Sequence, residues 1–446
     1  MPSERHSYPA NCMLYSTIRL KLASDSGSFP SSLNLHILSI PTSTRQQRFS
    51  REAVRFHPPN IETMPSREAT HAGSWYSDNA ATLTRQLDEW MNRVPNEIEG
   101  IGSLPVAGAR IIIAPHAGYA YSGPCAAFAY KSLDLSKAKR IFLLGPSHHH
   151  PFSKIALPEL SSYSTPLSQE PLPLDREIID ELSTRTENGT VRFTTMNQAI
   201  DEAEHSLELH LPYIHYLLQG LYPGEPAASY PKLVPMMVGS TSAPTEQAFG
   251  RILAPYLANP ENAFIVSSDF CHWGLRFAYA YYVPDAPAPG PVLPLSYAAL
   301  PQPSEALKLG AARPQISGMS KGRYLRAGDQ LPRGAGVPSI HESISACDIA
   351  CMSAIASGHT QTFLDALKST GNTICGRHPI GVIMAAIEFV LGKDKENMRD
   401  LDIKAGDEAQ THLMRGAFNF VRYERSSDCI SVTDSSVSYV SAFAVL

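Results

Sequence analysis

The chain has 446 residues, 43% of them hydrophobic, which is enough for one large domain or two ordinary ones with a buried core. Its formal net charge of −5 and isoelectric point of about 6.3 give no basic surface field, so neither nucleic acid nor membrane is expected as a partner. Seven scattered cysteines predict a reducing compartment, the cytoplasm with the nucleus as an additional location. No apolar run approaches the roughly 18 residues that span a bilayer.

Residues 1–63 differ in composition from the rest of the chain. They contain eleven Ser, and seven Lys or Arg against four Asp or Glu, without a sustained helical or strand period. An acid-poor leader of this kind is typical of an organellar transit peptide, whereas the well-patterned segment that starts at Met64 favours an upstream start-site error. We predict that residues 1–63 are disordered or non-native, with organellar targeting left open, and that residues 64–446 form one α/β domain.

Amphipathic patterns predict the helices. A Ser-Asp cap at Ser77 precedes the first of them, in which Leu83, Leu87 and Trp90 share one face. Further helical patterns lie at Asp175–Thr184, Glu204–Leu218, Thr245–Leu257, Ile340–Ala356 and Pro379–Leu391.

Short, uninterrupted apolar runs between these patterns predict the strands. Runs of this length that are β-branched or leucine-rich throughout are typical of buried strands in a parallel or mixed sheet. They lie at Arg110–Ala114, Arg140–Leu144, Leu233–Val238, Ala263–Ser267, Phe418–Tyr423 and Val437–Ala444. We therefore expect an α/β fold with a mixed central sheet flanked by helices and an antiparallel edge.

Residues 283–338 interrupt the alternation of helix and strand. They contain ten prolines, and six basic against three acidic residues, a composition that buries little apolar area. We predict a proline-rich surface insertion, either a disordered loop or a docking segment for a partner.

Four apolar runs are followed by a residue that can hold a metal ion. They are IIIAPHAGY at His116, IFLLGPSHHH at His148, FIVSSDFCHWG at Asp269 and NTICGRHPIG at Cys375. Ligands of open α/β sheets bind beyond the carboxyl ends of the strands, so we expect these four side chains to share one pocket. Two imidazoles, a carboxylate and a thiolate favour iron, copper or zinc over magnesium or calcium.

Cys375 is the cysteine for which we expect chemistry. It lies just before Pro379, a good first helical residue, and the N-terminus of a helix favours the thiolate. Three other cysteines are expected to be core residues: Cys271, Cys347 and Cys351.

The segment DEAEHSLELHLPY crowds Glu204, His205, Glu208 and His210 at the start of a predicted helix. The order and spacing differ from the HExxH zinc signature, so a zincin mechanism is disfavoured. We expect this segment to support a metal ligand from outside the coordination sphere.

The segments HAGSWY, APHAGY, GPSHH, EHSLELHLPY, SSDFCHWG, NTICGRHPIG and DSSVSY, in this order, resemble the Memo family (mediator of cell motility). The resemblance runs from about Arg67 to the C-terminus, apart from the insertion. It implies the fold of class III extradiol ring-cleaving dioxygenases and a metal site of His116, His148 and Cys375, with Asp269 close by. It also implies iron(II) or copper ahead of zinc, control of cellular redox state, and an adaptor role with signalling partners in cell motility.

Whether the chain is an enzyme, a metal-dependent oxidoreductase, is left open by these residues. In the first hypothesis it is a metal-binding redox protein, in which Asp269 and His272 orient ligands or water. In the second it is a non-haem iron dioxygenase acting on an aromatic substrate, with His205 or His272 as general acid or base. Dioxygenases of this class use two histidines and a carboxylate, so Cys375 argues against ring opening.

The third hypothesis is a non-catalytic adaptor. Its vestigial cleft would bind peptides or signalling partners between aromatic walls. The candidate walls are Trp75, Tyr119, Tyr121 and Trp273.

Overall fold

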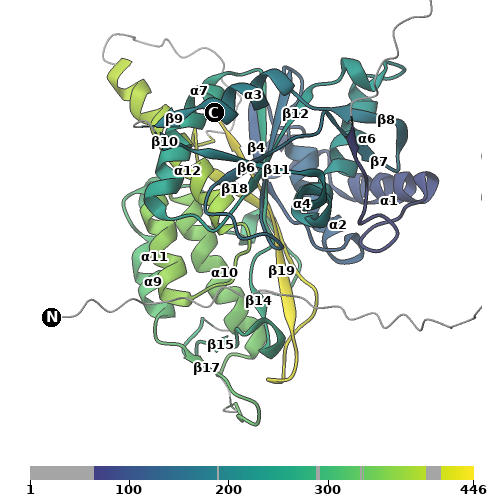
Figure 1. Cartoon of the computed structure of the whole chain (residues 1–446). Helices are drawn as coiled ribbons and strands as arrows, with labels where there is room; N and C mark the ends of the chain where they lie inside the picture. The colour runs from purple at the N-terminus through teal and green to yellow at the C-terminus, as the bar shows by residue number, and fades with distance from the viewer. Residues whose placement is uncertain (1–64, 188–189, 288–291, 332–333, 335, 398–412) are drawn as a thin grey trace, which may run out of the picture. The chain divides into compact units, whose positions relative to one another are not determined.

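A mixed β-sheet is the centre of the fold (Figure 1). In spatial order its main path is β11 (Phe193–Met196), β6 (Ile155–Pro158), β12 (Lys232–Val238), β5 (Arg140–Pro146), β13 (Asn262–Ser267), β4 (Ala109–Ala114), β19 (Ser436–Val445), β18 (Phe418–Arg425) and β16 (Leu295–Ser296). The strands β12, β5, β13 and β4 are parallel to one another. From β19 onward the pairing is antiparallel, which confirms the expected mixed sheet with an antiparallel edge.

The computed structural model describes residues 65–187, 190–287, 292–331, 334, 336–397 and 413–446. The predicted leader, residues 1–63, lies outside the described residues. In the described part of the chain, no helix combines the length and the apolar character that crossing a membrane requires.

The central strands form because their sequences are apolar on both faces. Every residue of β4 and β13 is buried. Phe264 of β13 pairs in register with Phe142 of β5, and the two rings stack with centroids 4.6 Å apart. Because β5, β13 and β4 are parallel neighbours, their carboxyl ends lie at the same edge of the sheet.

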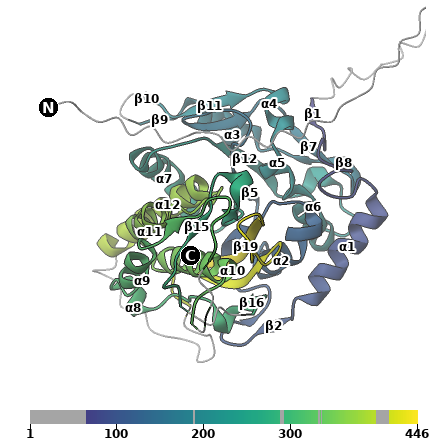
Figure 2. The same ribbon diagram turned by 90° about the horizontal axis from the view of Figure 1, so that it is seen from below.

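Helices cover both faces of this sheet, as the two views in Figures 1 and 2 show. One group consists of α1 (Ala80–Arg93), α2 (Tyr119–Ser132) and α6 (Leu211–Leu221). The other consists of α7 (Ala243–Ala258), α10 (Ile340–Ala356), α11 (Thr360–Thr370) and α12 (Arg377–Asn397). The remaining helices are α3 (Arg176–Thr184), α4 (Gln198–Ala203), α5 (His205–Glu208), α8 (Glu305–Lys308) and α9 (Ala312–Met319).

The prediction of one helix at Glu204–Leu218 is wrong. The segment forms two helices, α5 and α6, and Pro212 lies in the first turn of α6. Proline has no backbone N–H to donate to a preceding turn, so it favours the start of a new helix at this point. The interruption leaves His205 and Glu208 on a short helix of their own.

The described part of residues 283–338 forms short elements. These are β16, α8, α9 and β17 (Arg323–Tyr324), and α9 buries Ala312, Ile316 and Met319. The described residues of this segment are therefore not a loop without secondary structure, as one of the two predictions had it. Their status as an insertion stays a prediction.

Candidate metal centre

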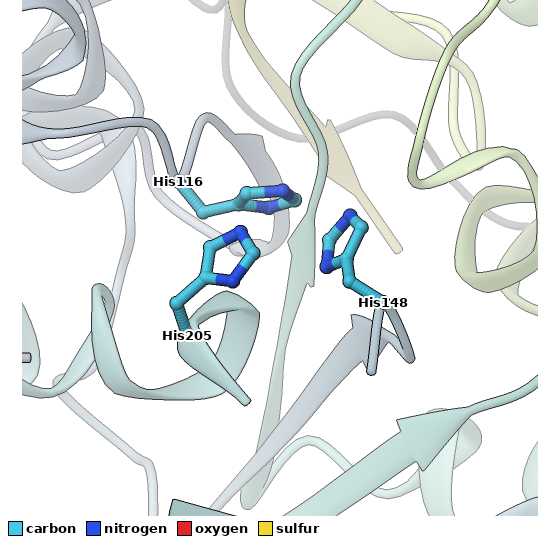
Figure 3. A group of neighbouring side chains, drawn as sticks. All are labelled: His116, His148 and His205. Atoms are coloured by element: carbon cyan, nitrogen blue, oxygen red, sulfur yellow. The ribbon is translucent and has the colours of Figure 1, made fainter. Parts of the chain in front are cut away.

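The candidate site lies at the carboxyl ends of β4, β5 and β13. His116 follows β4 by two residues, and His148 follows β5 by two residues. Asp269 follows β13 by two residues, and Cys375 precedes α12 by two. The imidazoles of His116, His148 and His205 are turned toward one another (Figure 3). Side chains that are far apart along the chain therefore meet at one edge of the sheet.

Two groups of candidate donor atoms share His116. Ring nitrogens of His116, His148 and His205 lie within 4.8 Å of one another. The donor atoms of His116, Asp269 and Cys375 lie within the same distance of one another. Sγ of Cys375 is 3.2 Å from Nε2 of His116, and Oδ2 of Asp269 is 4.0 Å from that nitrogen. The predicted donors are thus close together, and His205 joins them.

The tautomer of His116 follows from its hydrogen bonds. The Ser267 hydroxyl donates to the carbonyl oxygen of Ser206 at 2.7 Å, so its oxygen is free to accept from Nδ1 of His116 at 2.6 Å. The proton of His116 is therefore on Nδ1, and the lone pair of Nε2 faces Cys375. Burial lowers the pKa of His116 well below its usual value, and nearby imidazoles lower it further, so the ring is neutral.

His148 is oriented by Glu204. Nδ1 of His148 lies 2.9 Å from Oε1 of Glu204, and the backbone N–H of His148 also donates to that carboxylate. Burial alone would lower the pKa of His148, but the charge of Glu204 outweighs it and raises the pKa above its usual value. Burial opposes ionisation of Glu204, yet His148 keeps the pKa of this carboxyl well below its ordinary range. A histidine bound to a carboxylate through Nδ1 presents Nε2 to a metal ion.

His205 is held by stacking rather than by hydrogen bonds. Its ring stacks on Trp75 at a centroid distance of 4.3 Å and on His148 at 4.5 Å. Nδ1 lies 3.3 Å from Oε1 of Glu204 but has no hydrogen-bond partner among the described residues. The side chain is nevertheless buried, and burial lowers its pKa well below the usual value. His205 is therefore a neutral imidazole with a free lone pair.

A close backbone approach places Cys375 at the end of β13. A Cβ atom on Gly376 would lie 2.3 Å from Cβ of Ser268, so only glycine lets the two segments come this close. The backbone N–H of Gly376 then donates to Oγ of Ser268 at 3.1 Å. The N–H of Asp269 donates to Sγ of Cys375 at 3.2 Å, which orients the sulfur.

Asp269 connects the loops after β4 and β13. Its Oδ1 accepts from the backbone N–H groups of His116 and Ala117, at 2.9 and 3.2 Å. Burial raises the pKa of Asp269 to about 7, although these two hydrogen bonds lower it in part. Oδ1 thus fixes the loop that carries His116, and Oδ2 is the oxygen closer to Nε2.

A buried arginine fixes the segment that carries Glu204 and His205, and sequence reasoning did not find it. Arg67 donates to the carbonyl oxygens of Asp201 and Glu204, at 3.0 and 2.9 Å, and to the carboxylate of Glu208 at 2.6 Å. Burial opposes the charge of Glu208, but the hydrogen bond from His71 and the charge of Arg67 bring its pKa to about 2. Arg67 stands in the two-residue strand β1 (Ser66–Arg67), which gives no periodic signal.

His272 lies outside both donor groups among the described residues. Its Nδ1 is 3.0 Å from the carbonyl oxygen of Phe270, and burial lowers its pKa to about 4. In the HHH run only His148 belongs to a donor group, and His149 and His150 are exposed.

Of the four candidate aromatic walls, only Trp75 touches the site. It stacks on His205, whereas Tyr119 and Trp273 are core residues and Tyr121 is exposed. The prediction that Cys271, Cys347 and Cys351 are buried is confirmed.

The residues present fit a metal ion. Nδ1 of His116 and Nδ1 of His148 are both bound to partners, so the remaining nitrogens are in the form that a metal requires. Imidazole, thiolate and carboxylate donors within 4.8 Å of one another are the ligands of transition metals. The protein therefore has a candidate metal site.

Comparison with known proteins agrees with the motifs. Residues 67–443 match the family model described as Memo-like protein. The chain is similar to Protein MEMO1 of Homo sapiens and of Mus musculus, each 37% identical over 373 residues, or 84% of this chain and 95% of the relative. A MEMO1 family protein of Schizosaccharomyces pombe is 35% identical over 380 residues, 85% of this chain and 98% of the relative. The chain belongs to the Memo family.

Proposed function

We propose that this protein binds iron(II) or copper through His116, His148 and Cys375, with Asp269 close to the ion, and serves in cellular redox control. The observation that carries the proposal is the geometry at His116. Its Nε2 presents a lone pair to the sulfur of Cys375 at 3.2 Å, while Nδ1 is bound to Ser267. Soft thiolate beside imidazole favours reduced copper and iron(II), and zinc is the weaker candidate for this role.

The residues around the ligands have supporting roles in this proposal. Glu204 orients His148, and Ser267 orients His116, each by accepting a hydrogen bond from the Nδ1–H group. Asp269 accepts two backbone hydrogen bonds and holds the loop of His116 in place. When bound, the ion would supply one-electron chemistry, and the buried surroundings would limit its contact with water.

Elemental analysis after anaerobic purification tests this function. We expect about one iron or copper per chain, taken up on titration if absent after purification. Alanine variants of His116, His148 and Cys375 are each expected to lose the ion, whereas His150→Ala, an exposed histidine of the same loop, is the matched control and should retain it. Wild-type protein that takes up neither metal would contradict the proposal.

A second candidate function is an iron dioxygenase acting on an aromatic substrate. The observation that favours it is the carboxylate of Asp269 beside His116, because two histidines and a carboxylate leave open positions on ferrous iron. In this case His205 or His272 would be the general acid or base. Oxygen consumption by iron-loaded protein with a panel of catechols tests it, and no consumption above the apo-protein would remove it.

The adaptor role with signalling partners rests on family membership alone, and the cytoplasmic and nuclear location rests on the scattered cysteines. Binding of a partner by the His116→Ala, Cys375→Ala double variant would separate this role from the metal. Normal binding would make the adaptor function independent of the ion.

A further inference from the structure

We propose that His205 gives this site a second set of ligands, so that it discriminates between ions of different softness. In one set His116 acts with Cys375 and holds soft Cu(I). In the other, His116, His148 and His205 hold a divalent ion of borderline character, such as Cu(II) or Ni(II). The inference rests on the proposed function, because it requires that His116 bind a metal.

The two sets share one nitrogen and therefore compete. Nδ1 of His116 is bound to Ser267 at 2.6 Å, which leaves Nε2 as its only donor. That nitrogen is 3.2 Å from Sγ of Cys375, and His116 also belongs to the group with His148 and His205. One lone pair serves one ion, so His116 binds with either partner set but not with two ions at once.

His205 has the features of an unused ligand. The residue is only 8% exposed, yet Nδ1, which lies 3.3 Å from Oε1 of Glu204, has no hydrogen-bond partner among the described residues. A buried polar group without a partner costs about 1–3 kcal/mol, so such a group in a native fold calls for an explanation. A bound ion would supply the missing partner.

The ring of His205 is held in place for this role by its neighbours. Trp75 stacks on it with an interplanar angle of 27°, and His148 stacks with an angle of 21°. Stacking fixes the plane of a ring without engaging its nitrogens. Arg67 holds the backbone just before it by donating to the carbonyl oxygen of Glu204.

The chemistry of the donors decides which ion each set takes. Thiolate is soft and selects Cu(I), whereas imidazole suits divalent copper and nickel. The set of three histidines has no sulfur and no carboxylate, so it is neutral and nitrogen-only. The set with Cys375 and Asp269 contributes sulfur and oxygen.

Parallel titrations with Cu(I) and with Ni(II) test this assignment, the nickel ion being redox-inactive toward the thiol. The variant His205→Phe keeps an aromatic ring between Trp75 and His148 but has no donor. We expect it to lower Ni(II) affinity by about tenfold to 100-fold while Cu(I) affinity stays within about twofold. Cys375→Ser is expected to do the reverse. His215→Phe, which alters a buried imidazole that is bound to Thr165 and belongs to neither donor group, is the matched control.

Several outcomes separate the two proposals. If the wild type binds Cu(I) but not Ni(II), or if His205→Phe weakens both ions equally or neither, the second ligand set is overturned and the proposed function stands. If the wild type binds neither ion and takes up no iron(II) either, both fail. The unfolding temperature of the metal-free variants shows whether they fold, and His205→Asn takes the place of His205→Phe if the latter does not.

Discussion

Two buried regions of this protein contain cysteine and aspartate, and only one has the character of a metal site. In the cluster between β18 and α10, Asp348 accepts from Nδ2 of Asn372 at 2.8 Å and from the hydroxyl of Tyr423 at 2.9 Å. The backbone N–H of Cys271 donates to it as well, at 3.3 Å. At the strand ends, by contrast, the lone pair of Nε2 of His116 faces the sulfur of Cys375 at 3.2 Å, and Nδ1 of His205 has no hydrogen-bond partner among the described residues.

The contrast shows that burial of cysteine and aspartate does not by itself define a metal site. Burial raises the pKa of Cys271 and of Cys347 well above the usual value, so both thiols stay protonated. Their carboxylate neighbour, Asp348, is satisfied by neutral donors. A metal site requires lone pairs that remain free after the internal hydrogen bonds are made.

Removal of the ligand that both donor groups share should give the largest effect, and it tests whether the strand-end region is the one that binds metal. In His116→Ala both donor groups lose a member, so we expect metal affinity to fall by at least about 100-fold, or 2.7 kcal/mol. The matched control is His215→Ala, which removes another buried imidazole, one that is bound to Thr165 through Nδ1. Competition titration with a chelator measures the metal affinity of each variant. Equal affinity for His116→Ala and wild type would contradict the site.

The complementary change is made in the cluster around Asp348, where the buried carboxylate has all its hydrogen bonds. Asp348→Ala leaves Asn372 and Tyr423 without their buried acceptor, so we expect the free energy of unfolding to fall by about 2 kcal/mol. Metal affinity should stay within about twofold of the wild type, since the metal ligands are untouched. Chemical denaturation and metal titration of the same variant check the two expectations. A large loss of metal affinity in the folded variant would show that the two regions are not independent.

The support of His148 gives a smaller effect. Glu204→Gln keeps the shape of the side chain but removes the charge that orients the imidazole. We expect about a tenfold loss of metal affinity, as is usual when the partner of a ligating histidine is altered. Glu202→Gln, a half-buried residue of the same segment whose carboxylate accepts from the backbone N–H of Glu68 rather than from a histidine, serves as the control. Unchanged affinity in Glu204→Gln would mean that His148 is not a ligand, or does not need this partner.

Acid should destabilise the metal-free protein through a histidine away from the site. Burial lowers the pKa of His215 to about 4, below the 6.5 of an unperturbed imidazole. The unfolded chain therefore binds the proton first, so stability is complete above pH 6.5 and falls as the pH drops toward 4. The loss from this group is at most about 1.4 kcal/mol per pH unit. Chemical denaturation across this pH range should show that the free energy of unfolding depends less steeply on pH in His215→Gln than in the wild type. An unchanged slope would show that His215 does not cause the loss of stability in acid.

Much of this arrangement could be predicted from the sequence. Uninterrupted apolar runs located β4, β5 and β13, and the polar residue after each run gave His116, His148 and Asp269 at one sheet edge. The helix at Ile340–Ala356 was predicted from its helical pattern with its observed bounds, and the structure shows a capping box of Ser339 and Glu342 at its start. Local patterns are sufficient where a local cause decides the structure.

The rest depends on tertiary contacts that no local pattern contains. The roles of Ser267 and Arg67 arise from partners 151 and 137 residues away along the chain, His116 and Glu204. His205 was expected as an acid or base, and its place between Trp75 and His148 follows only from the folded chain. A polar serine at the end of an apolar strand was the one available signal for Ser267.

Anomalous diffraction from crystals of the metal-loaded protein tests the central claim most directly. The account predicts one peak within bonding distance of Nε2 of His116 and of Sγ of Cys375 for Cu(I). A peak that contacts neither His116 nor Cys375, or no peak in protein that binds the ion in solution, would contradict it.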